Sequence, residues 1–397
     1  MKKLDDTNII DTLSSYNENY STQTHDWTTD SIGTAILTKT PITEIISLAS
    51  KLISFRSTAE NHEERESIVA LASNYMKDLT VDVYESNAIK SLLVHNNKPG
   101  TKHFKILLNG HLDVVPGKDE QYVPYEKNGR LYGKGAYDMK AAVAVMMTLL
   151  KELNKDIHYP IALQITSDEE QSGINGAKYQ VDQGVRGEFI LSGECGSNFH
   201  IKNEAKGGYF LRLLAEGKAS HGAYPWNGDN AISKLYRVLH KIHEKYPSPQ
   251  EESHNTTVSV TKIHSTNNAT NRIPDHCEAG LDIRYTVADT DIIDRIKSLL
   301  PKDIALEIIV SWPPLKTAAD NKYIQLLKSI SQPVLQKDLP LVMGHGTSDL
   351  MRFAGTGCDG IEFGPIGGNQ HQDDEWVDIQ SLADYYQILK KFLLSVK

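Results

Sequence analysis

Residues 106–117 read ILLNGHLDVVPG. A short apolar run, typical of a buried strand, ends there in His111, and Asp113 follows after one further residue. One histidine near one aspartate at a strand end can arise by chance. Later stretches of the chain, however, also carry acidic or histidine side chains just after an apolar run or at the start of a helix. A fold that brings these stretches to His111 would form one polar site.

Strands and helices alternate along the residues that surround this stretch. Compact apolar runs predict strands over 104–109, 161–166 and 189–191. A largely apolar helix of about four turns is predicted from Asp138 onward, although Asp138 taken alone could equally be its N-cap. This alternation predicts an α/β layer built on a mainly parallel sheet.

In a parallel sheet, ligands bind outside the carboxyl ends of the strands, so polar residues there are candidates for a functional site. The candidates are His111, Asp138, Glu169, Glu170, Glu194 and His371. Carboxylates that share one cleft repel one another and raise one another's pKa unless cations neutralise them. Two divalent metals about 3.5–4 Å apart would do so. Mixed nitrogen and oxygen ligands suit zinc, with cobalt or manganese as substitutes.

The same candidates include a possible general base. Glu169 and Glu170 are adjacent, so in an extended segment their side chains point to opposite sides. One can bind a metal while the other takes a proton from metal-bound water. Asp113 can accept the second imidazole N–H of His111 and hold the ring in place.

The pattern changes between residues 206 and 312. Strands are predicted over 209–215, 257–263, 277–284 and 305–310, with one helix after the first strand and one after the third. This β-α-β-β-α-β order is ferredoxin-like and complete in itself. We therefore expect 206–312 to be a domain inserted into a first domain made of 41–205 and 313–397. Residues 1–40 are polar, show little periodicity and would form an N-terminal extension.

The composition limits the class of protein. The chain has 397 residues, of which 40% are hydrophobic and 23% charged, as in ordinary globular proteins. A net charge of -9 argues against a nucleic acid as partner. No stretch is long and apolar enough for a membrane span, and none at the N-terminus is typical of a secretory signal. With three widely spaced cysteines and no CxxC pair, we expect a cytoplasmic protein with reduced thiols.

The chain resembles the M20 family of metallopeptidases and deacylases in a series of segments. These occur in the order GHLDVVPG, YGKGAYDMK, SDEEQSG, SGEC, ASHGAYP, NRIP with DIRY, HGTSD and GPIGGNQHQDDEWV. The resemblance implies a zinc-exopeptidase-like catalytic domain with an inserted lid or dimerisation domain. It also implies hydrolysis of an amide bond, in an N-acyl amino acid or a small peptide, by a metal-bridged water.

The resemblance further implies a role for individual residues. The ligands of one metal would be His111, Asp138 and Glu194. The ligands of the other would be Asp138, Glu170 and His371, so that Asp138 bridges the two ions. Glu169 would be the general base, and Asp113 would support His111.

In the inserted domain, the resemblance implies that His221 steadies the oxyanion, commonly in the active site of the partner subunit of a homodimer. Asn271 and Arg284 would hold the substrate, together with a backbone clamp that includes Gly346 and Thr347. A structural ion pair with Glu278 or Asp282 is the rival interpretation of Arg284.

Other functions remain open at this level. The chain can be a binding or regulatory protein that keeps the fold without catalysis, and within the enzymes it can be a deacylase, a dipeptidase or a carboxypeptidase. The loop around His371 looks closer to the deacetylase and carboxypeptidase branch than to the desuccinylase branch. A serine hydrolase using Ser348 and His345 is disfavoured because no G-x-S-x-G turn is present.

Overall fold

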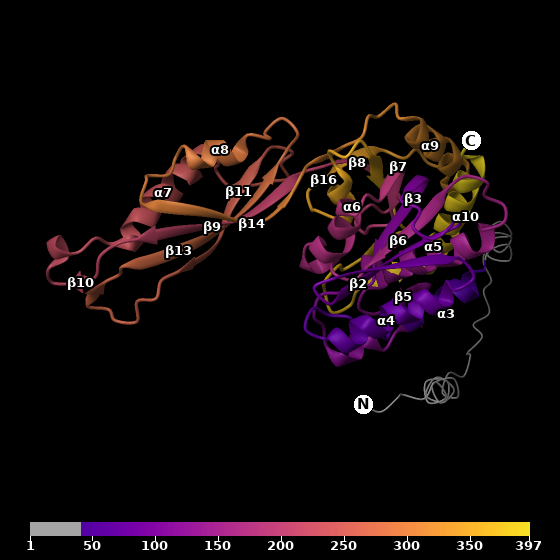
Figure 1. The fold of residues 1–397 in the computed structure, drawn as a ribbon, viewed down its shortest axis with the longest axis horizontal. Helices are drawn as coiled ribbons and strands as arrows, with labels where there is room; N and C mark the ends of the chain where they lie inside the picture. Colours follow the sequence, from indigo (N-terminus) through magenta and orange to yellow (C-terminus); the bar gives the residue numbers. More distant parts are fainter. Residues whose placement is uncertain (1–40) are drawn as a thin grey trace. The chain divides into compact units, whose positions relative to one another are not determined.

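The computed structural model describes residues 41–397, and Figure 1 shows how their helices and strands are arranged. Residues 1–40, the predicted N-terminal extension, lie outside the described part of the chain. The described residues form a nine-stranded sheet, two four-stranded sheets and a two-stranded ribbon.

The nine-stranded sheet has a parallel centre and mostly antiparallel edges. Its strand order is β1 (Thr80–Ser86), β2 (Ile89–His95), β6 (Ile161–Thr166), β3 (His103–His111), β7 (Arg186–Ser192), β17 (Asp359–Glu362), β8 (Ile201–Ala205) and β15 (Leu315–Lys316), with β16 (Leu341–Gly344) beside β8. Strands β6, β3, β7 and β17 are paired in parallel. The predicted α/β fold with a mainly parallel sheet is therefore confirmed.

Side chains of the central strands alternate between two hydrophobic cores, because successive residues of a strand point to opposite faces. In β3, Ile106 and Leu108 lie in one core, whereas Leu107, between them, lies in the other. The first core also contains residues of α3 (Ile42–Ile53), α4 (His62–Tyr75), α5 (Ala141–Leu153), α9 (Lys322–Leu335) and α10 (Ile379–Ser395). The second contains residues of α6 (Tyr179–Asp182) and η6 (Asp349–Phe353).

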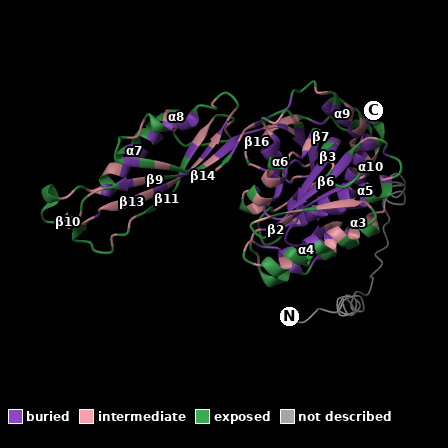
Figure 2. Cartoon of the chain, in the orientation of Figure 1, coloured by how far each residue is buried: buried purple, intermediate pink, exposed green. Residues whose placement is uncertain are grey.

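Figure 2 shows the central strands as buried elements, with exposed residues on the outer sides of the helices. Strands that are buried on both faces are largely apolar, as in the fully buried runs 106–108 of β3 and 161–163 of β6. In the described part of the chain, no helix combines the length and the apolar character needed to cross a bilayer.

A second sheet of four antiparallel strands has a hydrophobic core of its own. Its elements are β9 (Gly207–Glu216), α7 (Ala231–Lys245), β11 (Thr257–His264), β13 (His276–Tyr285), α8 (Ile292–Lys297) and β14 (Ile304–Trp312). The strands lie in the order β11-β13-β9-β14, and both helices pack against the core. The predicted ferredoxin-like arrangement is confirmed. The domain limits at 206 and 312, and the role of this unit as a lid or dimerisation domain, remain predictions.

A third, small sheet joins two distant parts of the chain. Its strand order is β18 (Gly367–Gly368), β19 (Trp376–Asp378), β5 (Arg130–Tyr132) and β4 (Tyr125–Lys127). Gly367 packs so closely that a Cβ there would lie 2.2 Å from the ring of Tyr137. The pairing brings the loop that carries His371 against the segment that precedes Asp138.

Candidate metal centre

Three neighbouring parallel strands carry polar side chains to one edge of the large sheet. Strand β3 ends at His111, Glu169 and Glu170 form the start of η3 (Glu169–Gln171) after β6, and Glu194 follows the end of β7. Because the strands run in the same direction, residues beyond their carboxyl ends meet at the same edge.

Two further residues reach this edge from elsewhere. Asp138 comes from the turn η2 (Ala136–Lys140) that precedes α5, and His371 comes from the loop between β18 and β19. The structure brings the possible ligand atoms into two groups of three, with the atoms of each group within 4.8 Å of one another. The groups are His111, Asp138 and Glu194, and Asp138, Glu170 and His371. Asp138 is thus shared by both groups.

Asp138 lies between the two imidazoles. Its Oδ1 is 3.0 Å from Nε2 of His111, and its Oδ2 is 3.1 Å from Nε2 of His371. Oε1 of Glu170 lies 3.1 Å from the same nitrogen of His371, and Oε2 of Glu194 lies 3.9 Å from Nε2 of His111. An aspartate in this position can bind two metal ions with one oxygen on each.

The crowded charges shift the pKa of the cluster's members. Burial, together with the charge of Asp138, raises the pKa of Glu194 to about 8. Burial raises the pKa of Glu169 well above its usual range. Hydrogen bonds with Asp138 and Glu170 raise the pKa of His371 to about 10. The residues therefore attract extra positive charge, and their imidazole and carboxylate donors fit two divalent ions.

His111 is oriented by the main chain of Asp113. Its Nδ1–H donates to the backbone carbonyl of Asp113 at 3.0 Å, which leaves Nε2 as the metal-binding atom. The carboxylate of Asp113, which we expected to hold this ring, has its Oδ1 farther away, at 3.6 Å from Nδ1. Its two oxygens instead accept the backbone N–H groups of Glu169 at 3.1 Å and Glu170 at 3.0 Å. Asp113 therefore supports the imidazole and the glutamate turn at the same time.

Glu169 belongs to neither group of ligands. Its Oε2 lies 4.0 Å from Nε2 of His111, and its side chain is 15% exposed. Its neighbour Glu170 is part of the second group. The two adjacent carboxylates thus have different surroundings, as expected if one binds a metal and the other transfers a proton.

The turn that carries Asp138 departs from the prediction. We expected a helix from Asp138 onward, but α5 begins at Ala141 and has no side-chain cap, so Asp138 is not its N-cap. Asp138 has φ −115° and ψ 89°, which is not helical. The carboxylate of Glu375 accepts the N–H groups of Gly135 at 3.2 Å and of Tyr137 and Asp138 at 3.0 Å. The prediction was wrong because this turn depends on a residue 237 positions away.

His221 and Asn271 lie together at the two-stranded ribbon. His221 is on β10 (Ser220–His221), which pairs with β12 (Arg272–Ile273), and the backbone carbonyl of Asn271 accepts the N–H of Gly222 at 2.6 Å. Nδ1 of His221 accepts the N–H of Ala223 at 3.0 Å. Within residues 41–397, no hydrogen bond or ion pair joins His221 to the ligand groups.

Arg284 and Thr347 form a second pair. The guanidinium of Arg284 donates to Oγ1 of Thr347 at 3.4 Å and to both carboxylate oxygens of Asp282, at 2.7 and 3.0 Å. Arg284 thus forms the ion pair with Asp282 that the rival, structural interpretation expects. Its contact with Thr347 also places Arg284 beside the predicted substrate clamp. Around Gly346 the space is open, with no atom within 4 Å of a Cβ built there.

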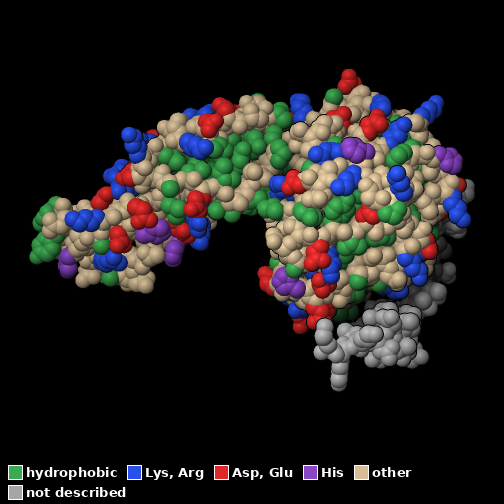
Figure 3. Space-filling model, viewed as in Figure 1, with side chains coloured by type: hydrophobic (Ala, Val, Ile, Leu, Met, Phe, Trp, Pro, Cys, Tyr) green, Lys and Arg blue, Asp and Glu red, His purple; other side chains and the backbone are tan. Residues whose placement is uncertain are grey.

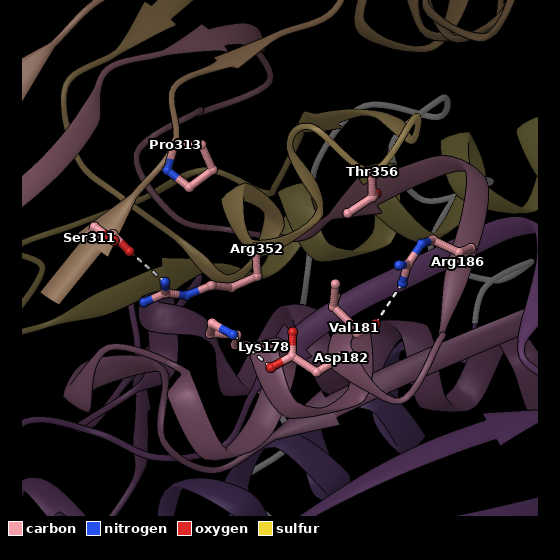
Figure 4. A pocket seen from close by; sticks show the side chains of 8 residues that line it. All are labelled: Lys178, Val181, Asp182, Arg186, Ser311, Pro313, Arg352 and Thr356. Carbon is pink, nitrogen blue, oxygen red and sulfur yellow. Dashed lines mark hydrogen bonds and ion pairs between the residues drawn. The ribbon is translucent and has the colours of Figure 1, made fainter. Parts of the chain in front are cut away.

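A pocket of about 440 Å³ lies apart from these residues. It is lined by Lys178, Val181, Asp182, Arg186, Ser311, Pro313, Arg352 and Thr356. In Figure 4, Lys178 points toward Asp182, with 2.6 Å between the charged atoms, and Arg352 donates to the backbone carbonyl of Ser311 at 2.7 Å. None of the candidate ligands lines this pocket, so it is not the metal centre.

An α/β sheet with two ligand groups that share an aspartate at its carboxyl edge is the arrangement of a two-metal hydrolase. The sequence pattern of peptidase family M20/M25/M40 matches residues 107–395. The chain is similar to the succinyl-diaminopimelate desuccinylase of Hydrogenovibrio crunogenus, with 30% identity over 381 residues that cover 89% of this chain and 99% of the relative.

Two solved structures show a similar fold. One is a tripeptidase from Staphylococcus aureus, with a TM-score of 0.72 and 20% identity, covering 89% of this chain and 97% of that chain. The other is a dinuclear metal-binding peptidase of the M20 family from Bacillus subtilis, with a TM-score of 0.64 and 12% identity, covering 89% and 97% of the two chains.

The chain therefore belongs to peptidase family M20/M25/M40 and is a hydrolase. The family resemblance inferred from its motifs is confirmed. The expected likeness of the histidine loop to the deacetylase and carboxypeptidase branch does not agree with the relative named above, which is a desuccinylase. The branch to which this loop belongs therefore stays a prediction.

Proposed function

We propose that this chain uses two divalent metal ions and the general base Glu169 to hydrolyse the amide bond of an N-acyl amino acid. One observation carries the proposal: two ligand groups share Asp138, while Glu169 stays outside both. In the proposal, the first group binds one ion and the second group binds the other. Zinc suits the nitrogen and oxygen donors best, with cobalt or manganese as substitutes.

The chain's own residues move the protons. Bound ions would polarise the amide carbonyl and make a water molecule reactive near neutral pH. Glu169 takes a proton from this water and returns it to the leaving nitrogen. Glu169 is free to carry the proton between the two transfers, because it belongs to neither ligand group. Asp113 keeps Glu169 in place by accepting its backbone N–H.

Residues at the β10–β12 ribbon, on β13 and in the loop before η6 complete the proposed site. His221 donates a hydrogen bond to the oxyanion, in the active site of the partner subunit. Arg284, Asn271, Gly346 and Thr347 bind the substrate carboxylate and the atoms next to it. The 3.4 Å contact between Arg284 and Thr347 supports a shared role for these two residues.

The proposed partner subunit is a second copy of the chain, docked through the second sheet. Its outer strands β11 and β14 leave several apolar side chains exposed, which are Val260, Ile263, Ile308 and Ile309. Figure 3 shows hydrophobic side chains gathered over this part of the chain. Exposed apolar edge strands are surfaces that favour pairing with another chain. We also propose a cytoplasmic location, supported by the absence of disulfides among Cys195, Cys277 and Cys358.

The substrate is proposed by chemical class. N-succinyl and N-acetyl amino acids come first, because the 30% identical relative is a desuccinylase. A short peptide is the alternative, since it offers the same amide bond beside a free carboxylate for Arg284. A hydrolysis screen with N-acetyl amino acids, N-succinyl amino acids and dipeptides, with zinc or cobalt added, separates these classes.

The substitution Glu169→Gln tests the general base. The variant should keep both metals, because Glu169 is in neither ligand group, and should lose about two to four orders of magnitude in kcat. Turnover of the best substrate of the screen and metal content by mass spectrometry check the two expectations. The control Glu188→Gln removes a surface ion pair with Lys322 and should change neither quantity. Near-normal turnover by Glu169→Gln would contradict the assignment.

A further inference from the structure

Glu375 is a buried carboxylate on the loop that carries His371. It is 1% exposed, and its two oxygens accept three backbone N–H groups. All three donors, from Gly135, Tyr137 and Asp138, belong to the turn that presents the shared aspartate. A buried carboxylate is unfavourable unless hydrogen bonds satisfy it. The three N–H groups of the turn therefore stabilise Glu375, and Glu375 in turn fixes the conformation of the turn.

A buried lysine ties the same loop to the same turn. Lys134 is 1% exposed, and its Nζ lies 3.9 Å from Oε2 of Glu375. The ammonium also donates to the backbone carbonyl of Gln372, the residue after His371, at 3.2 Å. On the other side of His371, Gln370 donates to Oδ2 of Asp138 at 2.7 Å. The loop is thus joined to the turn on both sides of the histidine.

We propose that Glu375 is a positioning residue that sets the place of Asp138 between the two metal ions. The inference rests on the two-metal function proposed above. Glu375 holds the main chain of Asp138, and its loop also carries His371, a ligand of the second ion only. This one loop therefore determines the position of Asp138 relative to His371. Replacing a residue that orients a metal ligand typically weakens metal binding about 10–100-fold.

The substitution Glu375→Gln tests the proposal. It keeps the size of the side chain but places an amide NH2 against either the backbone N–H groups or Lys134, where no acceptor is present. We expect the Kd for Zn2+ and Co2+, measured by competition with a chromophoric chelator, to rise about 10–100-fold. The visible absorption of the Co2+-loaded variant should also change in intensity, because it reports the geometry of the ligands. A purely structural role would lower stability and leave both readouts of the folded protein unchanged.

Two further variants serve as comparisons. Glu152→Gln removes a carboxylate that pairs with Lys390 and accepts the hydroxyl of Tyr386, away from both ligand groups. It should lower stability and leave the Kd for metal unchanged. Glu375→Asp keeps the charge but shortens the reach, so its Kd should fall between those of the wild type and Glu375→Gln.

The outcomes separate this inference from the proposed function. If the wild type binds two ions and Glu375→Gln binds them with a Kd within about twofold of wild type, the inference alone is overturned. If the wild type does not bind two ions, the proposed function is overturned first. If neither Glu375→Gln nor Glu375→Asp folds with metal in excess, Glu375 serves the fold rather than the metals, and the inference is again overturned.

Discussion

Glu169 and Glu170 are identical side chains in adjacent positions, but their surroundings differ, which supports the different roles proposed for them. Oε1 of Glu170 lies 3.1 Å from Nε2 of His371, whereas Glu169 stays outside both ligand groups and has a pKa raised by burial. The carboxylate of Asp113 accepts the backbone N–H groups of both glutamates. The proposed division between ligand and base therefore depends on how one aspartate holds the turn.

The substitution Asp113→Asn should reduce turnover without removing the metals. An asparagine offers one acceptor oxygen in place of two, so the N–H of Glu169 or of Glu170 would face an NH2 group. We expect kcat/KM to fall about 10–100-fold, while metal content at saturating zinc stays at the wild-type value. Steady-state kinetics and metal analysis on the same samples check both. Unchanged kcat/KM would show that the glutamate turn does not need this carboxylate.

At the scale of elements, strands were predictable and turns were not. The run 161–166 coincides with β6, because a central strand that is buried on both faces is largely apolar. The start of α5 was misplaced because Glu375, 237 residues from Asp138, holds that turn out of the helix. His111, Glu170 and Glu194 could be named from the sequence because parallel strands end at one edge, whereas the roles of Asp138 and His371 came from the family resemblance. Glu375, which supports them, could not, because only the folded chain brings it to Asp138.

The element η6 carries a buried carboxyl whose ionisation costs stability. Asp349 accepts the hydroxyl of Thr166, at the end of β6, at 2.6 Å. Burial, together with the charge of Asp168, raises the pKa of Asp349 to about 7. Because this pKa is higher in the folded than in the unfolded chain, the folded chain binds more protons between about pH 4 and pH 7. The contribution of Asp349 therefore becomes less favourable as the pH rises through that range.

Asp349→Asn should then raise the free energy of unfolding of the metal-free chain by about 1–3 kcal/mol at pH 8. The gain should largely vanish at about pH 4, where the wild-type carboxyl is protonated in the folded chain and about half protonated in the unfolded chain. Urea unfolding of both proteins at the two pH values measures the difference. An equal difference at both values would show that ionisation of Asp349 is not its cause.

At the scale of the whole molecule, the β10–β12 ribbon carries His221, which the proposed reaction needs at a metal centre. Within residues 41–397, its hydrogen bonds stay on the β10–β12 ribbon and do not reach the ligand groups. In a dimer, His221 of one subunit could instead contact the substrate at the metal centre of the other subunit. The sequence alone predicts the order of elements in this unit, but not which chain's site a residue serves.

Mixing two inactive variants tests this sharing. His221→Ala and Glu169→Gln should each be nearly inactive alone. After the two are unfolded and refolded together, about half of the dimers are mixed, and one of the two sites in each mixed dimer has both groups intact. Activity should therefore recover to about a quarter of wild type. No recovery, with mixed dimers shown by native mass spectrometry, would mean that His221 does not act across subunits.

Metal content tests the central claim, that Asp138 is shared by two metal sites, most directly. Protein purified without chelator and saturated with zinc should hold about two ions per chain, and His111→Ala and His371→Ala should each hold about one. Asp138→Ala should lose both ions, because it belongs to both ligand groups. A wild-type chain that holds a single ion, or an Asp138→Ala variant that still holds two, would contradict the account.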